Sequence, residues 1–273
     1  MAISTRDQLI DALANNSSRI LFDKASLANA AAGQFFSLFK ATGFPAVGTN
    51  PTTAAICNQS TTGAMTFANQ TAPVKSYLAY LFAASGNTTS SVEIVDRLCH
   101  MGGLSGTSAT GQTVNLDPVA LSVPASRYGS ADLSDIQWWL EIYTALGSTG
   151  VNATINVDYT DSTSGNLTVL ALGASPRQGR IYPLNALADA GKIIEKINTV
   201  TLSATTGAVG DFGFSCMRTR TNINPPIANY QMVQDWAQLG LPEIANDSCL
   251  MFTMLCSTTS TGTLRGGGKI AHG

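Results

Sequence analysis

The spacing of apolar residues changes along the chain, and this change constrains the fold more than any other sequence feature. Up to about Gly147, apolar residues recur every three or four positions, as on one face of a helix. Beyond it they alternate with polar residues, most clearly over 151–172. The sequence therefore predicts an α+β protein, with a mainly helical, loop-rich region over 1–147 and an antiparallel β-sandwich of jelly-roll type over 148–273.

The helices predicted in the first half begin and end at recognisable signals. Thr5 and Gln8 have the spacing of a capping box, so a first helix is expected to start there. A second is expected over 26–41, with Gly43 and Pro45 as the stop. Further helices are predicted over three more ranges, of which the first is apolar nearly all round and therefore buried: 76–84, 92–101 and 135–146.

The second half reads as a series of strands joined by turns. Residues 151–172 predict a β-hairpin whose turn is Asp161–Gly165. Further strands are predicted over 198–204 and 212–216, with a short helical crossing around 236–244. The apolar run 249–256 predicts a strand buried on both faces, and 263–271 is the segment expected to pair with it.

Charge content separates this chain from several classes of protein. Charged residues make up 12% of it, about half of the usual share. The 15 basic and 17 acidic residues contain no long basic run, which argues against specific nucleic-acid binding. No apolar stretch is long enough to span a bilayer. Because Met1–Asp7 shows no apolar core behind a basic start, we expect no signal peptide and synthesis in a cytosol.

The 5 cysteines form an odd set without metal-ligand spacing or a CxxC pair. In a reducing cytosol we expect buried free thiols, the alternative being a cross-link between subunits after release from the cell. The cysteines are Cys57, Cys99, Cys216, Cys249 and Cys256.

Histidine and serine offer no convincing catalytic arrangement. His100 follows Cys99 at a predicted helix end, where neighbouring side chains point about 100° apart. His272 is one residue from the end of the sequence, where a fixed catalytic geometry is not expected. The segment 103–107 resembles a nucleophile elbow, but its last glycine is displaced and no strand is predicted before it.

Phosphate and metal motifs are also incomplete. Residues 265–270 lack the first glycine of a phosphate loop, and Ile270 stands where Ser or Thr would hold magnesium. Asp158 and Asp161 flank a predicted turn and are expected to bond local amides, with a calcium site as the alternative. We therefore predict no catalytic residue, no cofactor, no metal site and no enzymatic activity.

Several residues are candidates for contacts between subunits. Small residues near 28–33 would allow another backbone to approach closely, as would the glycines at 266–268. Arg218 and Arg220, with Arg177 and Arg180, could bridge to an acidic neighbour. Trp139 fits the core, whereas Trp138 is placed at its edge or at an interface, with a sugar-binding platform as the alternative. The predicted interface set is Ala28, Ala31, Gly33, Trp138, Arg218, Arg220, Arg265, Gly267 and Lys269.

Three stretches of the second half resemble the β-sandwich parts of virion structural proteins of tailed bacteriophages, in the head and neck. They are residues 155–165, 197–214 and 251–265. The resemblance implies a non-enzymatic virion subunit, synthesised in the host cytoplasm, that binds copies of itself and other virion proteins. It implies a head-associated position, as a capsid, cement or decoration protein.

Other functions stay open at this point. A neck or tail component is the alternative within the virion class. A carbohydrate-binding module or adhesin would use the same sandwich with exposed aromatic residues such as Trp138 or Tyr159, although the sequence does not favour sugar binding. A serine hydrolase is the last alternative.

Overall fold

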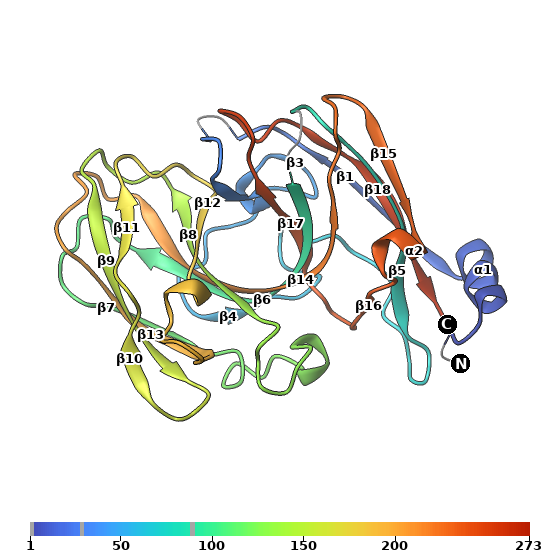
Figure 1. Ribbon diagram of the computed structural model, residues 1–273, viewed down its shortest axis with the longest axis horizontal. Coiled ribbons are helices and arrows are strands. Elements are labelled where there is room, and N and C mark those ends of the chain that lie inside the picture. The colour runs from blue at the N-terminus through green and yellow to red at the C-terminus, as the bar shows by residue number, and fades with distance from the viewer. Residues whose placement is uncertain (1–2, 28–29, 88–90) are drawn as a thin grey trace. The chain divides into compact units, whose positions relative to one another are not determined.

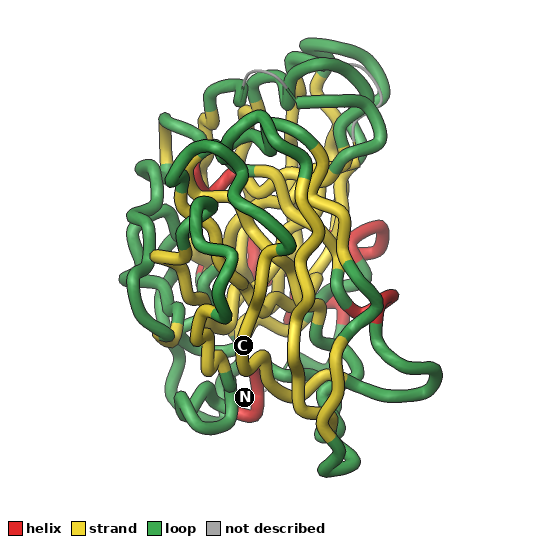
Figure 2. Tube along the Cα trace, turned by 90° about the vertical axis from the view of Figure 1, so that its left-hand side faces the viewer, coloured by secondary structure: helices red, strands yellow, loops and turns green. Residues whose placement is uncertain are grey.

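The computed structural model describes residues 3–27, 30–87 and 91–273. Strands dominate this part of the chain (Figure 2). The helices are α1 (Arg6–Asn15) and α2 (Trp236–Leu239), with 3₁₀ turns at Leu38–Lys40, Ala125–Arg127 and Asn185–Leu187. The strands are β1 (Ser17–Lys24), β2 (Phe35–Ser37), β3 (Gly43–Phe44), β4 (Ala55–Ile56), β5 (Ser76–Ser85), β6 (Ser91–Leu104), β7 (Gln112–Leu116), β8 (Gln137–Thr144), β9 (Val151–Tyr159), β10 (Ser164–Asn166), β11 (Leu170–Gly173), β12 (Arg180–Pro183), β13 (Ile194–Leu202), β14 (Asp211–Ile223), β15 (Gln231–Asp235), β16 (Glu243–Ile244), β17 (Leu250–Leu255) and β18 (Leu264–His272).

The prediction of a helical N-terminal half is wrong. Among the described residues of this half, only the first predicted helix is present: α1 is capped by Thr5, whose side chain accepts from the Gln8 amide in the predicted capping box. The described part of 26–41 contains β2 and a 3₁₀ turn instead of a helix, and the other three ranges correspond to the strands β5, β6 and β8. The protein is therefore a mostly β protein, and the α+β class does not hold.

Burial on both faces explains why these strands resemble helices in sequence. In β8 every residue from Trp138 to Tyr143 is buried, so the alternation expected of a half-exposed strand is lost. β6 is buried without interruption from Ile94 to His100. A short, nearly continuous apolar run does not distinguish a buried strand from a buried helix.

The strands predicted after Gly147 are present, but two of them pair differently. The hairpin around β9 forms, with β10 and β11 both antiparallel to β9. β17 is buried as expected, yet it pairs with β2 and β6. β18 pairs with β1 and β5, so the expected pairing of 249–256 with 263–271 is wrong.

The chain divides into two compact units. Unit 1 contains residues 1–48, 58–96 and 219–273, and unit 2 contains residues 49–57 and 97–218. Neither unit coincides with 1–147 or 148–273. Both are antiparallel (Figure 1).

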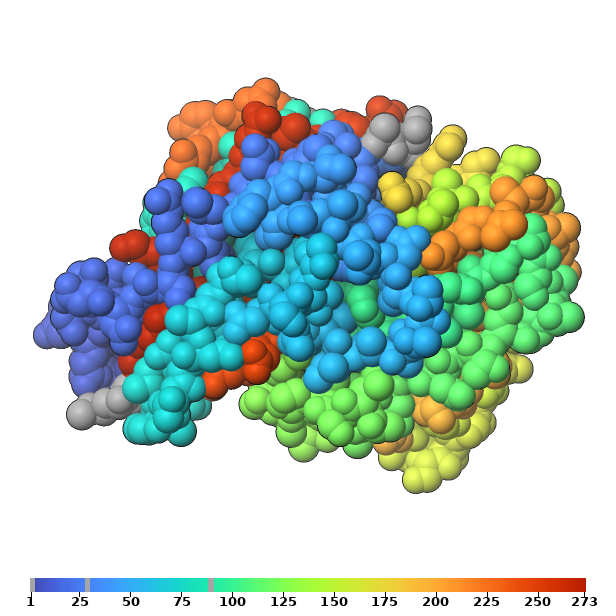
Figure 3. All heavy atoms as spheres, turned by 180° about the vertical axis from the view of Figure 1, so that it is seen from behind, coloured from blue at the N-terminus to red at the C-terminus, as the bar shows by residue number. Residues whose placement is uncertain are grey.

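Unit 1 is built around a sheet in the order β15-β5-β18-β1-β3, with β16 also paired to β5. Its inner face packs on β17, where the Phe22 and Phe252 rings lie 4.6 Å apart. Helix α1 rests on β5 and β18 through a small cluster that includes Leu9 and Ala271. In Figure 3 the dark-blue helix accordingly lies beside red C-terminal residues.

Unit 2 contains a sheet in the order β10-β9-β13-β7, with β11 beside β9. A second group, β14, β8 and β12, pairs in antiparallel fashion. One apolar cluster joins the two, including Trp138, Ile155 and Phe214. No helix in the described part of the chain is long and apolar enough to cross a membrane.

Candidate functional site

A buried ion pair is the most strongly charged feature of unit 2. Arg97 on β6 and Glu141 on β8 are 2.7 Å apart, and neither side chain is exposed. Arg97 also donates to the Tyr143 hydroxyl at 2.7 Å. Burial opposes the charged form of Arg97, but Glu141 and Tyr143 outweigh it and raise the pKa of Arg97. Because solvent does not reach these groups, the cluster is suited to holding strands together and not to binding a substrate.

None of the five cysteines forms a disulfide bond, and all of them are buried. Burial raises the pKa of Cys256 to about 11, and burial together with a hydrogen bond between Cys99 and Cys216 raises the pKa of Cys99. The thiolate is the reactive form, so Cys99 and Cys256 are poor nucleophiles. His100 lies within β6 and not at a helix end. Adjacent residues of a strand point to opposite faces, so Cys99 and His100 do not form a catalytic pair.

His272 is more ordered than its position in the sequence suggests. It is 3% exposed at the end of β18, and Gly273 exchanges two backbone hydrogen bonds with Lys75. The Ser18 hydroxyl lies 2.8 Å from Nε2 and the Ser76 hydroxyl 2.8 Å from Nδ1. Both ring nitrogens are thereby engaged with serines, whereas a catalytic triad places a carboxylate on one of them. Burial lowers the pKa of His272.

The remaining motifs serve local structure. Asp161 accepts from the Thr163 amide at 3.0 Å, and Asp158 accepts from the Ser164 hydroxyl at 2.6 Å. These bonds lower the pKa of both carboxyls, as expected for turn-forming aspartates. No group of three or more metal-ligating side chains gathers among the described residues. The segment 265–270 is a strand and not a phosphate loop.

The predicted interface residues have different surroundings. Ala28 lies outside the described residues, and Gly33 is exposed with open space beside it. Trp138 is 1% exposed and donates to the Ile194 carbonyl at 3.0 Å, which corrects its predicted place at an edge or interface. A large apolar ring between two sheets belongs to the core.

The predicted arginines have partners within their own units. In unit 2, Arg218 lies 3.6 Å from Asp135. In unit 1, Arg220 donates to the Glu243 carbonyl, and Arg265 lies 3.0 Å from Asp23.

The C-terminal glycines do not leave room for another subunit. A Cβ on Gly266 would lie 2.0 Å from the Phe82 carbonyl oxygen, and one on Gly268 would lie 2.4 Å from that of Tyr80. The space beside them is filled by β1 and β5 of the same chain. The sequence also predicts chain ends that are ordered only in an assembly, whereas the C-terminal strand β18 lies in the middle of a sheet within the single chain.

The outer face of the unit 1 sheet is a candidate contact surface. Side chains on β1 alternate, with Ile20 and Phe22 buried and Arg19, Leu21 and Asp23 exposed. Pairing places Leu21, Gly267, Phe82 and Val233 in one row across four strands. A second row contains Arg19, Lys269, Tyr80 and Asp235. Leu21 is 41% exposed and Val233 is 45% exposed, so the apolar row reaches solvent at both ends.

Lys269 holds one end of this face together by donating to the Leu13 carbonyl at 2.9 Å. It thereby ties β18 to the end of α1. Of the predicted interface residues, Arg265, Gly267 and Lys269 share the outer face.

The segment 227–236 concentrates exposed apolar side chains. Ile227 is 58% exposed, Tyr230 62%, Val233 45% and Trp236 36%. The segment includes β15, the edge strand of the sheet. Sequence reasoning missed this surface, although a signal is present: a large apolar residue recurs at every third position from 227 to 236.

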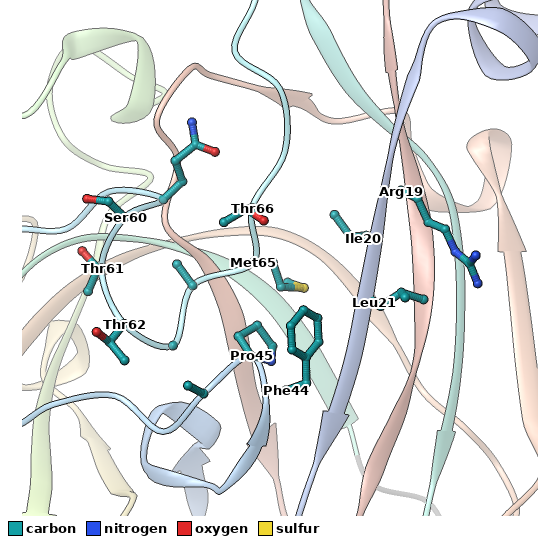
Figure 4. Close-up of a pocket in the computed structure, with 14 residues that line it drawn as sticks. Arg19, Ile20, Leu21, Phe44, Pro45, Ser60, Thr61, Thr62, Met65 and Thr66 are labelled. Atoms are coloured by element: carbon teal, nitrogen blue, oxygen red, sulfur yellow. The ribbon is translucent and has the colours of Figure 1, made fainter.

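A groove lies along the opposite edge of the same sheet (Figure 4). It has a volume of about 430 Å³ and is lined by Arg19, Ile20 and Leu21 of β1, by 44–46 and by 59–66. Phe44 and Met65 project into the space beside β1 (Figure 4). Arg19 is the one charged residue of this lining.

Comparisons with known proteins give only weak similarity. No protein-family model matches the chain, and no curated protein does. Among solved structures, a mutant VP2 protein of infectious bursal disease virus, in derived T=1 particles, is 10% identical with a TM-score of 0.16. The match covers 97% of this chain and 82% of that one.

Two further structures from the same virus match with similar sequence identities and TM-scores. The VP2 subviral particle is 11% identical with a TM-score of 0.16, covering 94% of this chain and 79% of that chain. The structure of the Gx strain is 10% identical with a TM-score of 0.17, and the match covers 100% of this chain and 85% of that chain. TM-scores this low carry no argument about the fold or the function of this chain.

Proposed function

We propose that this protein is a non-enzymatic structural subunit of a virus particle, acting through contacts with copies of itself and with other virion proteins. The observation that carries the proposal is the exposed apolar surface of unit 1, in particular the segment 227–236, which includes the edge strand β15. Contiguous exposed apolar surface rimmed by polar residues is typical of protein–protein contact sites.

The composition supports the same proposal. Only 12% of the residues are charged. Short polar side chains lose little conformational entropy when a contact orders them, and lysine and glutamate, which lose more, are depleted at the cores of interfaces. A surface rich in short polar side chains and poor in charged ones suits a protein that contacts several other subunits.

The more specific part of the proposal is a head-associated protein of a tailed bacteriophage, as capsid, cement or decoration subunit, made in the host cytoplasm. It rests on the resemblance of 155–165, 197–214 and 251–265 to virion β-sandwiches. A neck or tail position is the alternative. Trp138 and Tyr159, the aromatic residues named for the carbohydrate-binding alternative, are both buried, so neither offers a sugar-binding platform.

The absence of enzymatic activity is part of the proposal. It is supported by the closed Arg97–Glu141 cluster and by His272, whose ring nitrogens both face serines. A hydrolytic turnover that is lost on replacing His272 or Ser76 would contradict it.

Sedimentation velocity over a hundredfold range of protein concentration, with negative-stain microscopy of the same samples, tests self-association. We expect discrete oligomers that grow with concentration and appear as rings or shells. A monomer at every concentration would overturn the proposal. Glutaraldehyde-fixed samples serve as the control for dissociation on the grid.

A further inference from the structure

We infer that the unit 1 sheet continues from one copy of the chain into the next, with β15 of one copy adding to the free edge of β1 of its neighbour. This inference rests on the self-association in the proposed function and names the surfaces that would carry it. The occupant of the groove beside β1 is accordingly an edge strand of a second copy.

Both edges of the sheet present unpaired backbone N–H and C=O groups, at β15 on one side and at β1 on the other. β15 is paired with β5 alone among the described residues. On β1, residues 17–22 are paired only with β18, because β3 reaches β1 only at Asp23 and Lys24. Open edges with unpaired N–H and C=O groups are templates for another strand. β15 contains neither Lys nor Pro, residues that often protect such edges.

Strand directions are compatible with this addition. Each neighbouring pair in the order β15-β5-β18-β1 is antiparallel, so β15 runs in the same direction as β18 and opposite to β1. A second copy placed beyond the β1 edge, in the same orientation as the first, therefore brings its β15 antiparallel to β1 of the first copy. The contact is head-to-tail, and such contacts build rings or open chains according to whether the rotation closes.

The side chains select one register. Arg19 and Leu21 point outward from β1, and Val233 and Asp235 point outward from β15. Placing Val233 opposite Leu21 puts Asp235 opposite Arg19, which creates an apolar pair and an ion pair on the same face. A shift by two residues would place Val233 opposite Arg19 and lose both. The favoured register pairs 232–235 with 19–22 and ends where β3 occupies the edge of β1.

The polar atoms of both edges are available for such a contact. Arg19 is exposed, and it has no ion pair among the described residues. Asp235 uses Oδ1 to accept from the Ala237 and Gln238 amides at the start of α2, which leaves Oδ2 for a partner. On the same strand, Gln234 has a buried Oε1 without a hydrogen-bond partner. A buried acceptor without a donor is unfavourable, so the edge strand is incompletely satisfied in the single chain.

Apolar contacts would extend the interface beyond the paired strands. Ile227, Tyr230 and Trp236 flank β15 and are exposed. Phe44, 59% exposed, lies beside the β1 edge in the groove. Together they provide the apolar area that a short strand pair lacks on its own.

Cysteine cross-linking between two different variants tests the contact directly. Leu21→Cys and Val233→Cys copies are prepared separately, mixed and oxidised with a mild thiol oxidant. Directly opposite residues of an antiparallel pair have the separation that a disulfide needs. We expect the mixture to yield a disulfide dimer of the two variants at several times the yield of either alone. The native cysteines are all buried, so they should contribute little cross-linking of their own.

Matched controls make the outcomes distinguishable. Val169→Cys, an exposed valine of unit 2, replaces Val233→Cys in a parallel mixture and should give no dimer with Leu21→Cys. Adding Arg19→Glu to the Leu21→Cys copy should lower the cross-linking rate severalfold, whereas Arg19→Lys should preserve it. Circular dichroism checks that each variant is folded.

Three results would overturn the inference. Cross-linking of Val233→Cys with itself, equal to that of the mixture, would indicate a two-fold contact between β15 strands. Oligomers by sedimentation without a cross-link in the mixture would refute the β1–β15 contact and leave the proposed function standing. A monomer under all conditions would refute both.

Discussion

Replacing Glu141 with Gln is predicted to destabilise unit 2 strongly, because it leaves Arg97 buried without its carboxylate. The two side chains are 0% exposed and 2.7 Å apart, so solvent does not compensate for the lost charge. Removing one partner of such a pair costs about 3–5 kcal/mol of unfolding free energy. The Tyr143 hydroxyl, which accepts from Arg97, offsets only a small part of this loss.

Urea unfolding followed by tryptophan fluorescence measures this effect, because Trp138 and Trp139 are buried in unit 2 while Trp236 is exposed in unit 1. The matched control is the double variant Arg97→Met with Glu141→Leu, which removes both charges and should recover most of the loss. A loss below about 1 kcal/mol for Glu141→Gln, or a double variant as unstable as the single one, would refute this reasoning.

The other predictions concern unit 1. Burial lowers the pKa of Lys24 to about 8, so between pH 8 and its ordinary value of 10.5 the unfolded chain binds more protons and stability rises with pH. Comparing urea midpoints of the protein and Lys24→Met over this range checks the sign, and an identical pH profile would contradict it. Gly266→Ala is predicted to lose about 1–3 kcal/mol in urea unfolding, since its Cβ would meet the Phe82 carbonyl, whereas Gly165→Ala, with ordinary contacts only, should be nearly neutral. Deleting 265–273 should unfold unit 1 because β18 lies between β1 and β5; limited proteolysis would detect this, and an intact unit 1 would contradict it.

The sequence predicted the half-exposed hairpin and the capped helix, but of the strands buried on both faces it identified β17 and read β6 and β8 as helices. The hairpin around β9 was identified because Val151, Ala153, Ile155, Val157 and Tyr159 are buried at every second position. The α1 helix was identified from its capping box, Thr5 with Gln8, and from apolar residues at helical spacing. In β8 and β6, burial on both faces removed the period of two, and the same residues were read as helices.

Pairing between distant strands could not be obtained from neighbouring residues. β18 was expected beside β17 because the two are adjacent in sequence, yet its partners are β1 and β5. The glycines at 266–268 reflect this middle position, since β1 and β5 fill the space that a side chain would need. In the sequence alone, these glycines were interpreted as room for the backbone of another subunit.

The candidate surface was predicted only in part. Arg265, Gly267 and Lys269 belong to the outer face of the unit 1 sheet, but the exposed apolar edge at 227–236 was not recognised. Trp138 was placed near a surface because its neighbour Trp139 fitted a helical core face, and that face does not exist in a strand. Exposure of Tyr230 and Val233 depends on which strand lies at the edge of the sheet, which is a property of the whole topology.

The most direct test of the proposed function is quantitative mass spectrometry of virus particles purified on a density gradient from cells that express the complete genome encoding this chain. The account predicts that its peptides follow the particle band in a fixed ratio to the other virion proteins. Recovery of the chain only in the soluble fractions, with none in the particle band, would contradict a structural role in the virion.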